Sequence, residues 1–136
     1  MRDTYHNIGL KPVIAPVVVS DNTAQVGAIV DSAGYNSVTY AILTGTLADA
    51  DATFTVLLEE GNAANLSDGG AVADVDLLGT EALASFIFSD DGVARKLGYI
   101  GNKRYTRLTV TPAGNSGSAP IAAVALLGAP LSRPTA

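Results

Sequence analysis

Basic side chains are concentrated in the last third of the chain, where the chemistry they offer is the binding of anions. Arg95 and Lys96 are adjacent, and a second basic run begins at Lys103. Basic residues next to tyrosine can bind a nucleic acid or the carboxylates of another protein. Because 13 Asp and Glu residues outnumber 8 Lys and Arg residues, giving a formal charge of −5, the rest of the surface would repel a phosphate backbone. The sequence therefore predicts no nucleic-acid partner and a positive protein interface formed by Arg95, Lys96, Lys103, Arg104, Tyr105 and Arg107. Arg107 is suited to bind a carboxylate of that partner.

The sign of the charge changes along the chain. Residues 1–11 carry a net charge of +1. In residues 12–94 all charged residues are Asp or Glu, and the segment carries −12. In residues 95–136 all charged residues are Lys or Arg, and the segment carries +6. Two explanations are open. Either strands of one domain pair across this divide, or complementary patches allow copies of the chain to assemble.

The residue types needed for catalysis do not occur together. His6 is the only histidine, it follows Tyr5 in a short polar N-terminal segment, and the chain has no Gly-x-Ser-x-Gly motif. A Ser-His-Asp triad needs a fixed histidine beside an activated serine. We therefore predict that the chain is not an enzyme and needs no cofactor, and that Tyr5 and His6 contact a partner.

Carboxylates are the best metal ligands available, because the chain has no cysteine. Asp49 and Asp51, like Asp74 and Asp76, are two residues apart, which in an extended strand places both on one face. Oxygen ligands of this kind suit calcium, but the full calcium-loop pattern is absent. We predict no metal site and interpret these residues as solvated turn residues.

The hydrophobic pattern has a period of two in short runs that are separated by Gly, Asn, Asp and Pro, which is typical of an all-β protein. The expected strands are Val13–Val19, Gln25–Val30, Asn36–Thr44, Thr53–Glu59, Val72–Leu77, Ala84–Phe88, Val93–Ile100, Arg104–Thr111 and Ile121–Leu127, with a helical turn or two between Leu77 and Leu83. So many short strands suit two packed sheets. The sequence predicts a two-sheet antiparallel β-sandwich, jelly-roll-like, with an immunoglobulin-like sandwich as the alternative.

The predicted organisation is an N-terminal arm at residues 1–11, one sandwich domain at 12–128 and a C-terminal tail at 129–136. No membrane segment is expected. The run 121–127 and Val17–Val19 are apolar on both faces of their strands. Each is either buried on both sides or covered by another chain.

Several segments resemble small proteins encoded in the structural gene clusters of tailed phages and prophages. They are Gly98–Gly117, Ala119–Gly128, Asn22–Asp31 and Leu77–Glu81, so that the resemblance extends from about Asn22 to Pro130. It implies a virion protein that is made in the bacterial cytoplasm. Such proteins are often decoration or cement proteins, which form trimers on the outside of the head and brace neighbouring major capsid subunits.

The expected partners are thus the phage major capsid protein and further copies of the chain in a homotrimer, with the arm and tail reaching across subunit boundaries. Two alternatives remain. One is another virion part, such as a head–tail joining or tail protein. The other is a carbohydrate-binding surface module that aids host adhesion, since Tyr35, Tyr40, Tyr99 and Tyr105 offer apolar faces with polar tips.

Overall fold

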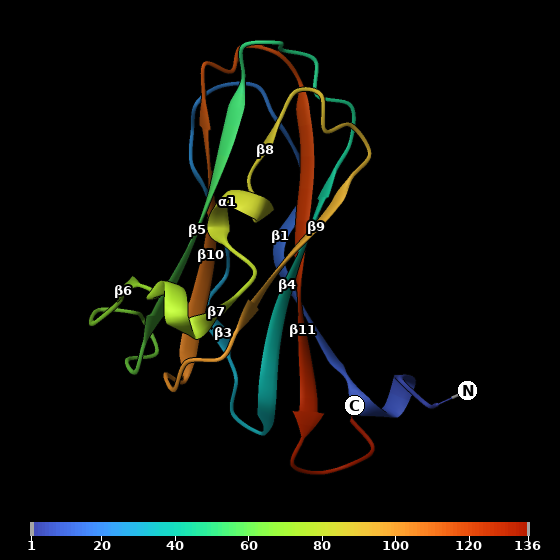
Figure 1. The fold of residues 1–136 in the computed structure, drawn as a ribbon, viewed down its shortest axis with the longest axis vertical. Helices are drawn as coiled ribbons and strands as arrows, with labels where there is room; N and C mark the ends of the chain where they lie inside the picture. Colours follow the sequence, from blue (N-terminus) through green and yellow to red (C-terminus); the bar gives the residue numbers. More distant parts are fainter. Residues whose placement is uncertain (1, 136) are drawn as a thin grey trace.

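Two antiparallel β-sheets packed face to face form the molecule (Figure 1), in a computed structural model that describes residues 2–135. Sheet A has the strand order β1 (Gly9–Val19), β11 (Ala119–Pro130), β4 (Tyr35–Thr44), β9 (Ala94–Tyr99) and β7 (Leu77–Leu78). Sheet B has the order β2 (Gln25–Val26), β10 (Tyr105–Ala113), β5 (Thr53–Gly61) and β6 (Gly70–Ala71), with β3 (Val30–Asp31) paired to β10 and β8 (Phe86–Ile87) paired to β5. Three short helices complete the chain: η1 (Tyr5–Asn7), η2 (Asp74–Asp76) and α1 (Glu81–Ala84). The predicted antiparallel sandwich is confirmed, and both the jelly-roll-like and the immunoglobulin-like alternatives are consistent with it.

Two predicted strands are wrong in detail where the chain passes between the sheets. The predicted strand Gln25–Val30 is divided into β2 and β3. Between them the backbone turns toward sheet A, where Ala28 N donates a 2.9 Å hydrogen bond to Val13 O of β1. Half of the predicted strand Val72–Leu77 is the turn of η2, in which Asp76 N donates to Ala73 O, and only Leu77 lies in a strand, β7. In both segments, tertiary contacts override a local alternation of apolar residues.

The first and last strands are longer than predicted. Strand β1 begins at Gly9, which pairs with Leu127, and β11 continues to Pro130. Thr135 donates hydrogen bonds from its N–H to His6 O at 3.1 Å and from its hydroxyl to Ile8 O at 2.7 Å. The two chain ends therefore lie side by side at one end of the sandwich (Figure 1).

Alternating side chains of both sheets fill the core. The largest fully buried ones include Tyr40, Ile42 and Leu97 from sheet A, and Phe54 and Leu58 from sheet B. As the sequence predicts, Phe54, Val56 and Leu58 point inward while their neighbours in β5 point outward.

One polar contact joins the two sheets inside this core. The Tyr40 hydroxyl lies 2.6 Å from Thr106 Oγ1, and both residues are buried. Burial raises the pKa of Tyr40 to about 12, so that the phenol stays neutral. Because each hydroxyl satisfies the other, the pair fixes the position of β4 over β10 without leaving a buried polar group unpaired.

Helix α1 closes the free edge of β5. On that edge β5 pairs with β8 at Thr53–Phe54 and with β6 at Glu59–Glu60, which leaves the stretch between them without a partner strand. There Val56 N donates to Ser85 Oγ at 3.0 Å, and Leu58 N donates to Glu81 Oε1 at 2.7 Å. Side chains of the helical segment thus take the place of a neighbouring strand.

Candidate protein interfaces

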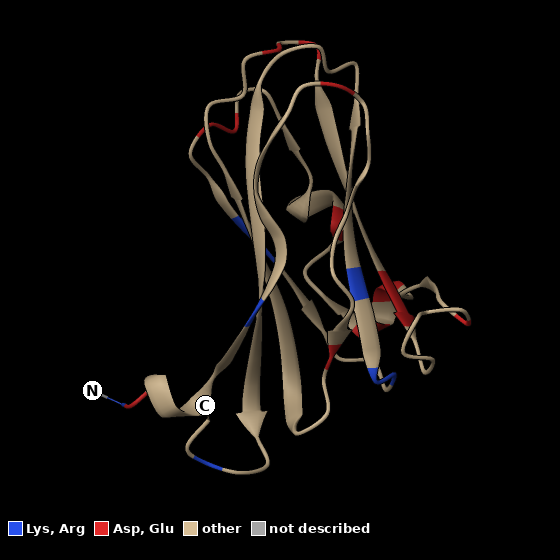
Figure 2. Ribbon diagram, turned by 180° about the vertical axis from the view of Figure 1, so that it is seen from behind, with Lys and Arg blue, Asp and Glu red and all other residues tan. Residues whose placement is uncertain are grey.

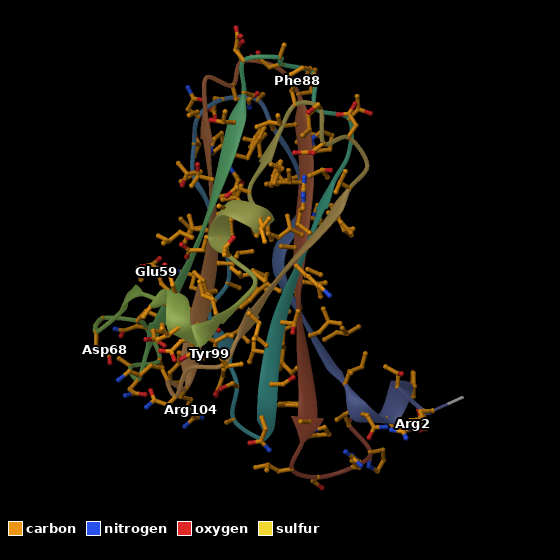
Figure 3. All side chains as sticks on the ribbon, viewed as in Figure 1. Arg2, Glu59, Asp68, Phe88, Tyr99 and Arg104 are labelled. Carbon is orange, nitrogen blue, oxygen red and sulfur yellow. The ribbon has the colours of Figure 1, made fainter. Side chains whose placement is uncertain are left out.

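The six basic-cluster residues are spread over both sheets. Arg95 and Lys96 belong to β9 in sheet A, whereas Tyr105 and Arg107 belong to β10 in sheet B, and Lys103 and Arg104 lie in the loop that joins them. Figure 2 shows the basic segments at separate places on the ribbon, and in Figure 3 Arg2 and Arg104 lie on opposite sides of the molecule. The sequence cluster therefore does not become one continuous positive face.

The three arginines of the cluster bind carboxylates of their own chain. Arg107 Nη2 lies 3.1 Å from Glu59 Oε1, its cross-strand neighbour in β5. Arg104 forms a two-bond pair with Asp31, in which both distances are 2.8 Å, and Arg95 Nη2 lies 2.8 Å from Asp90 Oδ1. Strands do pair across the charge divide, and this first explanation of the sign change is confirmed.

The pKa values around these pairs reflect their contacts. The Arg104 guanidinium group lowers the pKa of Asp31 below its usual range, and Asp31 in turn raises the pKa of Arg104. Arg104 also lies over the Tyr105 ring, with its guanidinium carbon 5.1 Å from the ring centroid. The carboxylate expected for Arg107 is thus supplied within the chain, and a contact of these residues with a partner stays a prediction.

Lys96 and Lys103 differ from the arginines, since neither has a carboxylate within ion-pair distance among residues 2–135. Lys96 is exposed on the outer side of sheet A. The backbone N–H of Lys103 donates a 2.9 Å hydrogen bond to the Tyr99 hydroxyl, which donates to Glu60. Burial raises the pKa of Tyr99. The two ammonium groups are the members of the cluster that remain available to another chain.

Tyr5 and His6 lie in η1, at the end of the sandwich where the chain ends meet. Tyr5 is 81% exposed and contacts the His6 ring edge-on, with centroids 5.0 Å apart. His6 Nδ1 lies 2.5 Å from Asp3 Oδ2. Both rings are accessible to a partner, which is the position that their predicted role requires.

The opposite end of the sandwich is acidic. Its loops contain Asp21, Asp49, Asp51, Asp90 and Asp91, and within the described chain they contain no lysine or arginine (Figure 2). Asp49 Oδ2 accepts hydrogen bonds from Ser116 N at 2.8 Å and Ser116 Oγ at 2.9 Å. The carboxylates therefore organise loops and keep this end strongly negative.

The candidate metal ligands do not converge in the structure. Asp74 and Asp76 lie in the turn of η2 and not in an extended strand, so the same-face argument does not hold for them. Residues 2–135 contain no group of three or more His, Asp or Glu side chains that could hold a metal ion.

Acid should weaken the structure through Asp49. Hydrogen bonds from the Ser116 and Asp51 backbone lower its pKa below the ordinary value of 3.8. A carboxylate with a lowered folded-state pKa stabilises the fold above its unfolded-state pKa, and this contribution is lost as the pH falls through the folded-state value. We expect an Asp49→Asn variant to lose stability at neutral pH and to show a shallower decline below about pH 4 in urea titrations. Asp51→Asn is the control, because none of the described hydrogen bonds is accepted by its carboxylate; equal pH profiles for wild type and Asp49→Asn would contradict the prediction.

The outer faces of the two sheets have opposite character. Outward residues of β5 and β10 in sheet B are mixed: four threonines and the Arg107–Glu59 pair lie beside Leu57, Tyr105 and Ala113. Outward residues of sheet A are nearly all apolar. We call this set the apolar face: Leu10, Pro12, Val18, Pro120, Ala122, Val124, Leu126, Ala41, Leu43, Ala94, Gly98 and Leu78, together with the polar residues Ser37, Thr39 and Lys96.

The apolar face is open to solvent. Val18 is 59% exposed and Leu43 is 52% exposed, and the outward side chains of β11 are half-buried by their neighbours in the sheet. Lys96 carries its single charge. Burial on both sides within the chain, the first alternative for the apolar runs at 17–19 and 121–127, is wrong, because Val18 and the outward side chains of β11 reach solvent. Cover by another chain stays a prediction. A large exposed apolar patch on a folded chain marks a surface that contacts another molecule.

Comparisons with known proteins relate the chain by structure only. No family model matches, and no curated protein matches in sequence. The PBSX exported protein XepA, a phage protein, has a TM-score of 0.57 at 14% identity, over 91% of this chain and 38% of XepA. This likeness shows a shared fold, and the chain spans well under half the length of XepA.

Two further solved structures align less well. One is a family two carbohydrate esterase from Cellvibrio japonicus, with a TM-score of 0.32 and 14% identity over 95% of this chain and 36% of the esterase chain. The other is the Mud crab tombus-like virus, with a TM-score of 0.27 and 10% identity over 98% of this chain and 86% of the virus chain. Scores this low carry no argument about this chain. Within residues 2–135, no helix has the length and apolar character needed to cross a membrane.

Proposed function

We propose that this chain is a structural protein of a phage particle, a decoration or cement protein that coats the outside of the head and braces neighbouring major capsid subunits as a trimer. The apolar face of sheet A carries the proposal, because it gives the molecule a surface built for contact with protein. The resemblance of residues 22–130 to virion proteins supports it, and so does the fold shared with a phage exported protein.

The acidic loops at one end of the sandwich suggest how such a protein would stand on the shell. The end with the chain termini presents Tyr5, His6, Asp3 and Arg133, while the described opposite loops contain five aspartates and no lysine or arginine, although Arg95 of β9 pairs with one of them, Asp90. We orient the terminal end toward the major capsid protein and the acidic end toward solvent. Many copies on a symmetric lattice would then turn a modest contact into firm retention, since release requires several contacts to open together.

The position of the protein in a particle tests this function. In an electron-microscopy map of a virion that contains this protein, we expect density for the sandwich on the outer surface of the head, with η1 against the shell. Density confined to the tail or to the head–tail joint would overturn the decoration function and favour the other virion part.

Deletion of residues 2–8 tests the contact with the shell. The deletion stops before Gly9, so β1 keeps its pairing with β11 and the sandwich should stay folded. We expect occupancy on purified heads to fall at least about tenfold, which corresponds to about 1.4 kcal/mol of binding free energy per copy. Thr55→Glu, on the outer side of sheet B, is the control and should bind as wild type. Unchanged occupancy after the deletion would show that the terminal end does not bind the shell.

A further inference from the structure

We infer that a second copy of this chain covers the apolar face of sheet A. This inference deepens the proposed function, because it names the surface that copies share within an assembly. It concerns the free protein, so it can succeed or fail independently of where the protein sits in a particle.

The register of the sheet shows why the apolar face can approach another flat surface. Across the strands, Pro12, Val124 and Ala41 form one row that ends at Lys96 of β9, and Ala122, Leu43 and Ala94 form the next. Small side chains in the middle of a sheet allow a second layer to come within about 10 Å, the usual distance between packed sheets.

Protrusions and hollows of the same chemistry alternate on this face. Leu43 is half-exposed and borders two apolar hollows of about 310 and 370 Å³, which it shares with Ala122. A third hollow of about 490 Å³ lies between β9 and α1, where Leu78 and Leu83 border Gly98, and its lining also includes Arg95 and Lys96. A surface that offers both leucine protrusions and apolar hollows is complementary to its own copy.

The area of the face is close to what a stable contact needs. Its four long strands, at about 4.8 Å spacing and about 3.3 Å per residue, cover roughly 20 by 35 Å, or roughly 700 Å². A typical specific interface buries about 800 Å² on each partner. Contact between copies over most of this face therefore comes close to the size of a typical interface.

Charge also favours a second copy over a strongly charged partner. The chain carries −5, yet the apolar face contains one charged residue, Lys96, so two copies can meet there without bringing their carboxylates together. A highly charged surface would find almost no counter-charges on this face and would lose hydration without compensation.

Neither edge of sheet A is suited to assembly by the addition of a strand from another copy. Strand β1 forms one edge and contains Pro12 and Pro16, which have no N–H to donate to an added strand. Strand β7 forms the other edge and is two residues long. The face, and not the edge, is therefore the part of sheet A that can receive a second copy.

Light scattering after size exclusion, combined with sedimentation over a concentration series, tests the inference on the purified full chain. We expect wild type to have two or three times the mass of one chain, which is 13.8 kDa. Leu43→Glu should lower the association constant at least about thirtyfold, as loss of a central interface residue does. The matched control is Leu57→Glu, which places the same charge on the outer side of sheet B, where Leu57 is 36% exposed, and should assemble as wild type.

Each outcome bears on the inference. A dimer or a trimer that dissociates in Leu43→Glu supports it. A wild-type chain that is monomeric at all concentrations overturns it, as does an oligomer that survives Leu43→Glu. If Leu43→Glu fails to fold by circular dichroism, Ala122→Glu on the neighbouring strand serves as the second variant. Loss of head occupancy in Leu43→Glu with an unchanged mass would assign the face to the shell protein and overturn the inference.

Discussion

Phe54→Ala is expected to lower the free energy of unfolding by about 3–5 kcal/mol, the usual cost of removing a buried ring. Phe54 is fully buried in β5 and stacks on Phe86 of β8, with ring centroids 4.8 Å apart and ring planes 12° apart. Its removal leaves a cavity beneath the short strand β8, which pairs with β5 over two residues. Since a domain of this size is usually stable by about 5–15 kcal/mol, much of the total would be lost.

Urea unfolding followed by circular dichroism measures this effect. Phe54→Leu keeps most of the apolar volume and should cost about 1–1.5 kcal/mol. Thr55→Ala, one residue along and facing outward, should change stability by no more than about 0.5 kcal/mol. A loss below about 1 kcal/mol for Phe54→Ala would contradict the packing described for this end of the core.

The second large effect is expected at Glu81. Glu81→Ala removes the oxygen that accepts a hydrogen bond from Leu58 N. The Leu58 N–H is then left without a partner, on the part of β5 between its pairings with β8 and β6. An unsatisfied buried donor costs about 1–3 kcal/mol, so we expect a loss of that size in the free energy of unfolding. Hydrogen exchange adds a local measurement, because the Leu58 amide should exchange much faster in the variant.

Glu81→Gln separates the hydrogen bond from the charge. Its amide oxygen can accept from Leu58 N as the carboxylate does, so it should keep most of the stability and the slow exchange. If Gln and Ala variants were equally destabilised, the charge of Glu81 and not its hydrogen bond would be responsible. If both variants matched wild type, the edge of β5 would not depend on this side chain.

The sequence predicts the long strands well because their burial is decided by alternation within one segment. Strands β4, β5, β9, β10 and β11 each lie within a few residues of the predicted limits, since one side of every strand must face the core. The short strands β2, β3, β6 and β7 depend on which sheet the chain is crossing, and that is decided by residues far away in sequence. The helical turn predicted within 77–83 is found at Glu81–Ala84.

The candidate site shows the same division. The basic residues are neighbours in sequence, yet Arg107 binds a carboxylate 48 residues away and Arg104 binds one 73 residues away. Which cations stay free depends on strand pairing, and therefore could not be read from their spacing. The apolar face could be predicted only in part. The runs 17–19 and 121–127 are apolar at outward positions as well as inward ones, but the pattern does not show whether another part of the same chain covers the outward positions.

The closing of the β5 edge by α1 has a consequence for the order in which the chain folds. Leu58 and Glu81 are 23 residues apart, and Val56 and Ser85 are 29 apart, whereas Arg107 and Glu59 across the β5–β10 pairing are 48 apart. Shorter loops close with a smaller loss of chain entropy, and they also leave the ribosome sooner. The edge of β5 that faces α1 is therefore expected to form its hydrogen bonds before the other edge pairs with β10. During that interval a nascent chain exposes one open edge of β5 in place of two, which limits strand addition between neighbouring chains.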